Sequence, residues 1–530
     1  MQPRPVVRTL IALALSMALA PRALAEAPDD DSDHEVFVEP GEGWWMDRHG
    51  VFHPFERTYS DWSPSRYEAR PGRAALEMLG LLGIGAAWYW IKSEQNKEDW
   101  EFPPLEERLL TFDAVRFDNN LFVTNHILHP AAGGAYYGFS RVNGLGPFPS
   151  IGYSVASAVV WEWGLELIEK VSINDLVYTP FGGWAFGEWF FQLGDYLNSA
   201  PGGGSWANRL ASYTLGAPRY LHDRWDDAPP PPSLPVDNLG FSTAFWHRFG
   251  VMYGLSGVDN DSKKSGIVHD AVLEAEVIRM PGLLRPGHIE RGFGEGNFVD
   301  MRSRMSFDET GVAEVDLWFS ADVAGYFHQD LEPASGGVRG QAWSGALNVA
   351  GRFVDRWLLR ERDAWALAHL PGPALKGWIA EGPLLFRVSA AAHLDFAAVH
   401  SLAYEAWTEE QGGSTGAKTV LQKHSYYFAH GASATAQATV AYHGTELGLR
   451  SSFGHYESIE GLDRYQPTVL LDVHNSDEIL EGAVWLGHTT PGAPLQVRVA
   501  LEGTRRTSAM TPLSELRWDR RASVNVGLGF

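Results

Sequence analysis

Two glutamates lie four residues apart within an otherwise apolar segment of the chain. Residues 152–168 are apolar on nearly all sides, yet they include Glu162 and Glu166. On an α-helix this spacing places both carboxylates on one face. Because two buried carboxylates are costly unless they are paired, protonated or bound to a cation, the pair is a candidate for acid–base chemistry.

A histidine before this segment and an aspartate after it complete a candidate polar cluster. His129 could exchange a proton with a carboxylate, and Asp175 could act as a general base or orient a histidine. Asp175 also has a structural interpretation, because Ser172 three residues earlier gives a capping-box pattern. The candidate catalytic residues are therefore His129, Glu162, Glu166 and Asp175.

The glutamate pair also has a purely structural interpretation. Arg141 could form a buried salt bridge with both glutamates, and Tyr136 or Tyr137 could donate hydrogen bonds to them.

A metal site is a further hypothesis for the same region. His126 and His129 are three residues apart, and with Glu162, Glu166 or Glu188 they could form a histidine–carboxylate site. This spacing is common by chance, and His129 could simply precede a helix. We therefore expect no cofactor. The chain has no cysteine, which excludes disulfides, thiolate chemistry and a lipoprotein anchor.

Helices of period 3.6 should position these residues. We expect them at about 130–143, 152–170 and 180–198, the last beginning with Thr179 as N-cap before Pro180. Glycine pairs four residues apart favour close helix packing: they are Gly134 with Gly138 and Gly183 with Gly187.

An apolar run at 74–91 is marginal in length for crossing a bilayer. Its glycines at 80, 83 and 85 favour close packing, so we expect a buried helix there. The alternative is a membrane anchor.

Residues 113–191 resemble the bacterial domain-of-unknown-function family 3943. The matching residues are Thr124-Asn125-His126, His129-Pro130, Gly134, Tyr136-Tyr137, Arg141, Gly144, Trp161-Glu162, Glu166, Ser172-x-Asn174-Asp175, Thr179-Pro180, Gly182-Gly183 and Gly187-Glu188. Val171 departs from the family's tendency to proline. The resemblance implies an envelope setting and no assigned activity. Its motifs add structural or binding residues to the candidates: Arg141, Tyr137, Ser172, Asn174, Gly183, Gly187 and Glu188.

The N-terminus predicts export. Arg4 and Arg8 precede an apolar stretch, and Ala23 and Ala25 fit a signal-peptidase site, so residues 1–25 are interpreted as a cleaved signal peptide. The net charge of −23 makes nucleic acid an unsuitable partner.

After a proline-rich stretch the period changes from 3.6 to 2. Apolar and polar residues alternate over 313–323, 386–396, 432–442 and 495–501, which predicts strands with one apolar and one polar face. A soluble sandwich could use such strands, but the final alternating segment ends on Phe530. That ending resembles the terminal signal of outer-membrane barrels, so we expect the apolar face to point toward lipid.

The predicted fold is an α+β multidomain protein: an all-α helical domain followed by an antiparallel outer-membrane-type β-barrel of about 12 strands. The predicted divisions are a signal peptide (1–25), an acidic leader (26–70), a helical domain (71–225), a linker (226–236) and the barrel (237–530).

The expected location is the cell outer membrane, with its lipid and the barrel assembly machinery as partners. The first functional hypothesis is a barrel whose helical domain plugs, gates or binds an envelope ligand. The alternative is an envelope enzyme that modifies lipid or glycolipid through the His/Glu/Asp cluster.

Overall fold

The computed structural model describes most of the chain beyond the N-terminal stretch. The described residues are 44–46, 52–54, 68–92, 101–199, 206–228, 246–261, 265–280, 282–359, 361–410, 419–465, 473–490 and 494–529. The predicted signal peptide, most of the acidic leader, most of the proline-rich linker and Phe530 lie outside them. The predicted domain boundaries therefore stay predictions.

Helices dominate the described chain up to residue 225. The α-helices are α2 (Pro71–Lys92), α3 (Leu105–Leu109), α4 (His129–Val142), α5 (Pro147–Val160), α6 (Ile173–Val177), α7 (Gly183–Asn198), α8 (Trp206–Thr214) and α9 (Ala217–Trp225). Three π-helical turns join them: η3 (Thr124–Leu128), η4 (Trp161–Leu165) and η5 (Tyr178–Gly182).

The three helices predicted near the glutamates exist, with shifted ends. The second begins earlier, at Pro147, where Gly146 is the N-cap and proline stands at the first helical position. It ends earlier too, because the chain leaves helical geometry after Leu165. The predicted N-cap at Thr179 is wrong, because η5 is already helical there and the N-cap of α7 is Gly182.

Helices α4 and α7 pack so closely that glycine is required at their contact. A Cβ atom on Gly183 would lie 2.5 Å from the backbone nitrogen of Gly134, and one on Gly187 would lie 2.8 Å from its carbonyl oxygen. A Cβ on Gly138 would meet nothing within 4 Å. The close packing predicted from the glycine spacing is therefore present, but Gly138 takes no part in it.

Twelve antiparallel strands form a closed ring. They are β5 (Trp246–Asn260), β6 (Ser265–Ile278), β8 (Phe298–Asp308), β9 (Gly311–Ala334), β10 (Gly337–Leu358), β11 (Glu361–Gly382), β12 (Leu384–His400), β13 (Tyr426–Tyr442), β14 (Thr445–Ser458), β15 (Asn475–Thr489), β16 (Leu495–Met510) and β17 (Leu513–Gly529). The ring closes where β17 pairs with β5, from Gly529 opposite Gly250 to Asp519 opposite Asn260.

Short elements accompany the ring. Strand β7 (Gly287–Phe293) pairs with β9 beyond the end of β8. Two helices, α10 (Tyr404–Glu410) and α11 (Val420–His424), follow β12. Three further short strand pairings or bridges involve the N-terminal region: β1 (Trp44–Met46) with β2 (Phe52–Pro54), β3 (Val115–Arg116) with β4 (Val171–Ser172), and Phe117 with Asp463.

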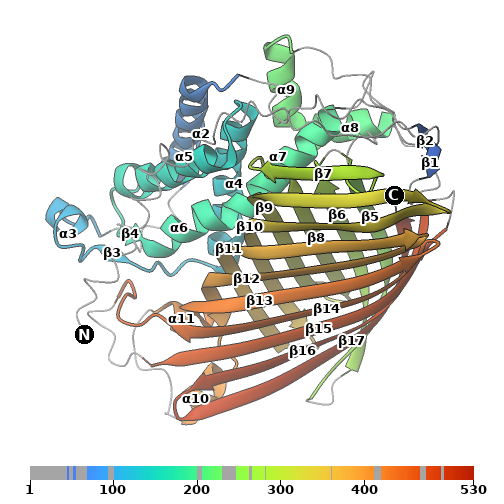
Figure 1. The fold of residues 1–530 in the computed structure, drawn as a ribbon. Helices are drawn as coiled ribbons and strands as arrows, with labels where there is room; N and C mark the ends of the chain where they lie inside the picture. The colour runs from blue at the N-terminus through green and yellow to red at the C-terminus, as the bar shows by residue number, and fades with distance from the viewer. Residues whose placement is uncertain are drawn as a thin grey trace.

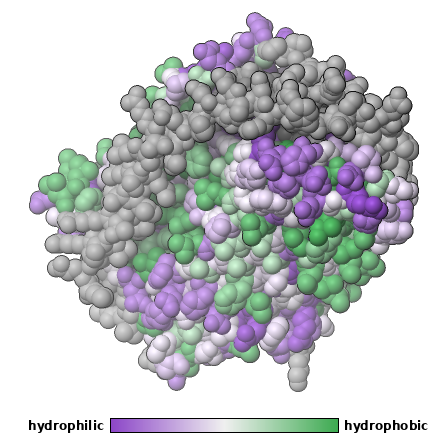
Figure 2. All heavy atoms as spheres, viewed as in Figure 1, coloured by the Kyte–Doolittle hydropathy of each residue, from purple (hydrophilic) through white to green (hydrophobic). Residues whose placement is uncertain are grey.

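The strands alternate as the sequence predicted, with the apolar face outward. On β16, Leu495, Val497, Val499 and Leu501 are exposed, whereas Arg498 and Glu502 line the interior. The hydrophobic side chains gather in patches on the outer surface of the strands in Figure 2. This arrangement is typical of a membrane barrel and excludes the sandwich alternative.

The helices pack on the outside of the barrel wall. Trp318 and Ser320 line the interior, so Phe319 between them points outward, and it contacts Phe186 and Trp189 of α7. The helices accordingly gather along one side of the barrel in Figure 1.

The same outer wall continues across several strands. Tyr178 of η5 donates a hydrogen bond of 2.9 Å to the carbonyl of Ala366 on β11, and its ring lies 5.2 Å from that of Phe396 on β12. The shared hydrophobic core runs from Ala275 on β6 to Phe428 on β13. One arc of the barrel is thus covered by protein where lipid would otherwise lie.

Helix α2 departs from the expectation of a buried helix. Only 22% of its most apolar 18-residue window is buried, and it is the one helix in the described chain long and apolar enough to cross a membrane. Met78 and Leu82 pack against Tyr136, but Leu76 is 71% exposed and Ile91 is 74% exposed. Of the three glycines on which the prediction rested, Gly80 and Gly83 meet no neighbour within 4 Å. Close packing is present only at Gly85, where a Cβ atom would lie 2.9 Å from the ring of Trp161.

We predict that Gly183→Ala destabilises the helices and that Gly138→Ala does not. The new methyl at position 183 must displace backbone atoms of α4, which should lower the free energy of unfolding by about 1–3 kcal/mol. The methyl at position 138 enters open space and removes a helix-interior glycine, so the expected change there is neutral or a gain of up to about 1 kcal/mol. Thermal melts followed by near-ultraviolet circular dichroism compare the two variants. Equal melting temperatures would contradict the assigned contact.

Candidate functional site

Glu188 forms a fully satisfied buried ion pair with Arg141. The Nε of Arg141 donates to one carboxylate oxygen at 2.9 Å and its Nη2 to the other at 3.1 Å. Tyr137 and Gln192 also donate to this carboxylate. The hypothesis that Arg141 neutralises the other two glutamates is wrong, because its donors are used by Glu188, Leu145 and Glu295. A bidentate ion pair of this kind fixes the relative position of the two side chains, so we interpret the Arg141–Glu188 pair as structural.

The predicted catalytic residues meet in a second polar cluster, at the junction of α4, η4 and α6. His129 begins α4, and its Nε2 lies 3.5 Å from the Oδ1 of Asp175 on α6. The backbone amide of Asp175 donates to Ser172, the N-cap of α6, at 3.3 Å. Asp175 therefore takes part in both the capping interaction with Ser172 and the contact with His129.

Glu162 is buried and only half satisfied. Its Oε2 accepts a hydrogen bond of 2.7 Å from the backbone amide of Ser172, while its Oε1 has no partner in the described chain. Burial, with Glu166 and Asp175 nearby, raises the pKa of Glu162 well above its usual range. Both effects favour the protonated form of this carboxyl group.

Glu166 lies just past the end of the helix rather than on one helical face with Glu162. The π-helical turn ends at Leu165, and Glu166 has already left helical backbone angles. Burial, with Glu169 and Asp175, raises the pKa of Glu166 to about 8. Burial lowers the pKa of His129, against the opposing effect of Asp118 and Glu166. The cluster thus contains a protonated acid, Glu166, and a neutral imidazole, His129.

An amide network supports Asp175. Asn174 donates to Asp175 at 2.9 Å and to Asp118 at 3.1 Å, and Asn125 donates to Asp118 at 2.6 Å. Asp118 and burial together raise the pKa of Asp175, with burial the larger effect. Sequence reasoning missed Asp118. The available signal was the run Asp118-Asn119-Asn120, three polar residues directly before an apolar helical segment.

Arg108 was also missed, and it holds the turn that carries the glutamates. Its guanidinium donates at 2.5 Å to the carbonyls of Glu162 and Glu169. Arg464, from the segment between β14 and β15, reaches the carboxylate of Glu169 at 3.0 Å. The barrel therefore contributes directly to the position of the cluster. Nothing in the local sequence could pair residues almost 300 positions apart.

The histidines do not form the hypothesised metal site in the described part of the chain. The Nδ1 of His126 lies 2.6 Å from the carbonyl of Phe122, and its ring packs among Tyr178, Tyr426 and Phe428. Burial lowers the pKa of His126 to about 3. No group of three or more histidine, aspartate or glutamate side chains among the described residues is arranged to hold a metal ion.

Comparison with known proteins agrees with the architecture and gives no activity. Residues 114–217 match the model of a family described as a domain of unknown function, DUF3943. The resemblance expected for residues 113–191 is therefore confirmed. A search of curated proteins finds no match.

Two solved structures that resemble the chain are outer membrane proteins. A loop-deletion mutant of OmpT from Vibrio cholerae has 8% identity and a TM-score of 0.20, covering 54% of this chain and 100% of that one. OpdK from Pseudomonas aeruginosa has 10% identity and a TM-score of 0.15, covering 54% and 99%. The scores are low, so the assignment of the barrel stands on its own strand pairing. The protein is an outer-membrane-type β-barrel in which residues 114–217 match the DUF3943 model.

We predict that Arg141→Met destabilises the helices because it leaves Glu188 as a buried charge without a cation. The expected loss in the free energy of unfolding is about 3–5 kcal/mol. Adding Glu188→Gln removes that charge while keeping an acceptor for Tyr137, so the double variant should be more stable than Arg141→Met alone. Thermal melts of the two variants and the wild type test this. A double variant no better than the single one would contradict the pairing.

A second prediction concerns pH. Because the folded pKa of Glu166 is raised, the folded state binds a proton that the unfolded state has released. The contribution of this group to stability is fully present below its unfolded pKa, about 4.3, and is lost as the pH rises toward about 8. Replacement by glutamine removes this dependence. The melting temperature of the wild type should therefore fall relative to Glu166→Gln between pH 5 and pH 8. Parallel curves for the two proteins would show that Glu166 titrates normally.

Proposed function

We propose that the protein is an outer-membrane barrel whose helices bind an amphipathic envelope ligand, a lipid or glycolipid, beside the outer wall. The observation that carries this proposal is the packing of η5 and α7 on outward-facing strand residues. It puts the His129 cluster on the side of the barrel that faces lipid. The interior cavities are lined by strand residues together with Leu359 from a turn. No described helical residue lines either of these cavities, which supports binding beside the outer wall rather than plugging of the barrel.

Exposed apolar side chains beside the cluster support a lipid-like ligand. Leu128 precedes His129 and is 57% exposed, and Leu167 follows Glu166 and is 48% exposed. Alkyl chains can cover such residues while a polar headgroup meets the histidine and carboxyl groups. The exposed apolar face of α2 adds a surface suited to the same lipid environment.

The expected location and partners belong to this proposal. Outward apolar strands require a bilayer, and export to the outer membrane requires the predicted signal peptide and the barrel assembly machinery.

The contact between His129 and Asp175 favours a second candidate, an enzyme that modifies the bound lipid. A neutral histidine held near a carboxylate is suited to accept a proton, and an acid with a pKa about 8 is suited to donate one near neutral pH. His129 would then accept a proton and Glu166 would donate one at the lipid headgroup. The two candidate functions use the same site, and they differ in whether the bound lipid is chemically changed.

The test is the lipid that co-purifies with the full-length protein. We expect mass spectrometry of mild-detergent preparations to find a defined lipid with the wild type and at least about tenfold less with His129→Gln or Glu166→Gln, because the first removes the imidazole and the second removes the acidic proton donor that would contact the headgroup. The control is Glu106→Gln, an exposed carboxylate on α3.

Cellular lipid extracts separate the two candidates. Overproduction of an enzyme changes the lipid profile, and the two site variants abolish the change. Overproduction of a binding protein leaves the profile unaltered. Equal lipid content in the wild type and both site variants would rule out the cluster as a ligand site.

A further inference from the structure

One cavity inside the barrel is lined by more basic than acidic side chains. It has a volume of about 190 Å³, and its lining includes eight arginines or lysines and six aspartates or glutamates. The whole chain has a net charge of −23. The lining therefore opposes the charge of the protein, which makes the interior the part of the molecule suited to an anion.

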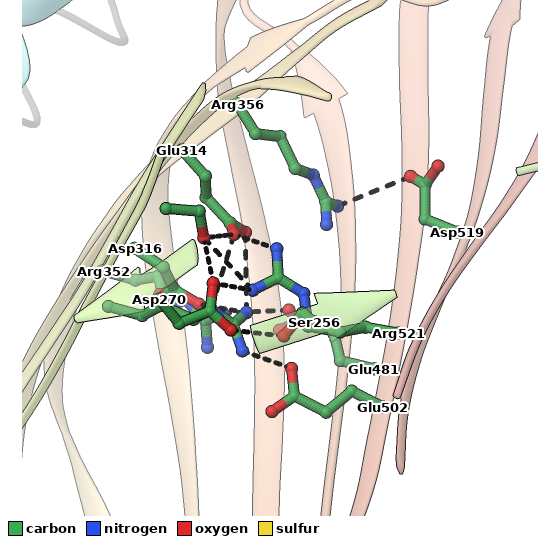
Figure 3. A network of polar contacts seen from close by, with 12 residues as sticks. Ser256, Asp270, Glu314, Asp316, Arg352, Arg356, Glu481, Glu502, Asp519 and Arg521 are labelled. Carbon is green, nitrogen blue, oxygen red and sulfur yellow. Dashed lines mark hydrogen bonds and ion pairs between the residues drawn. The ribbon is translucent and has the colours of Figure 1, made fainter. Parts of the chain in front are cut away.

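Most charges of the interior neutralise one another. Figure 3 shows carboxylates and arginines converging there, among them Glu314 with Arg521. Glu502 accepts from Arg304 at 2.5 Å, and Asp316 accepts from Arg352 at 3.2 Å. These carboxylates are already neutralised by the nearest arginines and repel an incoming anion only weakly.

Arg450 on β14 is different. It lines the interior, and it makes no hydrogen bond and no ion pair with any residue of the described chain. Its charged neighbours are Arg302, Arg352, Glu502 and Asp316. A guanidinium that faces a cavity without a carboxylate partner retains all five donors for a ligand.

Arg302 on β8 supplies a second underused cation. Its contact with Asp300 is long, at 3.7 Å, and its Nε and Nη1 are buried without a hydrogen-bond partner in the described chain. Its guanidinium lies 5.1 Å from the centre of the Trp318 ring, which holds it in place.

These residues stand where two cavities meet. The second cavity has a volume of about 60 Å³. Its lining includes Leu358, the last residue of β10, and Asp519 in the first half of β17, which begins at Leu513. Nine residues line both cavities: Arg302, Arg304, Asp316, Trp318, Arg352, Thr435, Arg450, Ala483 and Glu502. They form the boundary between the two cavities. Four of them are arginines and two are carboxylates, so cations are in excess at this boundary, and charged side chains that line a pore select ions.

We propose that Arg450 and Arg302 form a binding site for a small oxyanion at the boundary between the two cavities. Planar guanidinium groups bind phosphate or carboxylate through paired hydrogen bonds. A cavity of about 190 Å³ holds one such group with a few waters, each of which takes about 30 Å³ in the liquid. The ligand is inorganic phosphate or the carboxylate end of a small organic acid. The site is separate from the helices and does not depend on their proposed function.

Isothermal titration of the full-length protein in detergent with inorganic phosphate, and separately with succinate, tests the site. We expect one of the two anions to bind at one site per chain, and the tighter one identifies the source of the oxyanion. Arg450→Gln and Arg302→Gln should each raise the dissociation constant about tenfold or more. Arg450→Lys keeps the charge but loses the paired geometry, so its effect should be intermediate. The control is Arg291→Gln, which removes an exposed arginine on β7.

The heat-dependent shift of the folded barrel on a gel confirms that each variant is assembled before titration. If Arg450→Gln fails to assemble, Arg450→Lys and Arg302→Gln decide the question. Absence of binding by both anions to the wild type would overturn the proposal. The proposal would also be overturned if Arg302→Gln and the Arg450 variants bound the anion with the same dissociation constant as the control, Arg291→Gln.

Discussion

Closure of the strand ring by β5 and β17 is the constraint on which the rest of the structure depends. In a bilayer no water is present to satisfy the backbone groups of a free strand edge, so only a closed sheet is stable. Closure separates an outer wall from an interior. The alternation of the strands then gives the outer wall its apolar residues and the interior its arginines and carboxylates. Both candidate sites exist only because these two surfaces have been separated.

Buried ionisable groups are stabilised in two ways in this protein. In the interior, most arginines and carboxylates neutralise one another, as Arg304 and Glu502 do. Among the helices, the Arg141–Glu188 pair uses the same principle. In the cluster of Glu162, Glu166 and Asp175, burial and the neighbouring carboxylates raise the pKa of all three groups. A carboxyl group with a raised pKa is better suited to proton transfer near neutral pH than one held in an ion pair.

Much of the fold followed from local patterns. The period of 2 predicted the strands, the alternating segment that ends on Phe530 predicted their apolar outward face, and the glycine spacing predicted close helix packing, which α4 and α7 show. What could not be predicted was the docking of one part on the other. The contacts of Phe319 with α7 and of Arg464 with Glu169 join segments far apart in the chain. For the site, residue types and spacing identified His129, Glu162, Glu166 and Asp175, but the partner of Arg141 depended on how α4 and α7 cross. The apolar pattern of α2 gave no indication of which of its faces would be covered.

The covered arc of the outer wall has a consequence for the order of assembly. The surface that receives the helices is composed of residues from β6 to β13, from Ala275 to Phe428. Those strands follow the helices in the chain, so the helices are synthesised before the surface on which they pack. Their apolar faces can be covered by the barrel only once the strands have paired. These helices, although synthesised early, therefore complete their packing late.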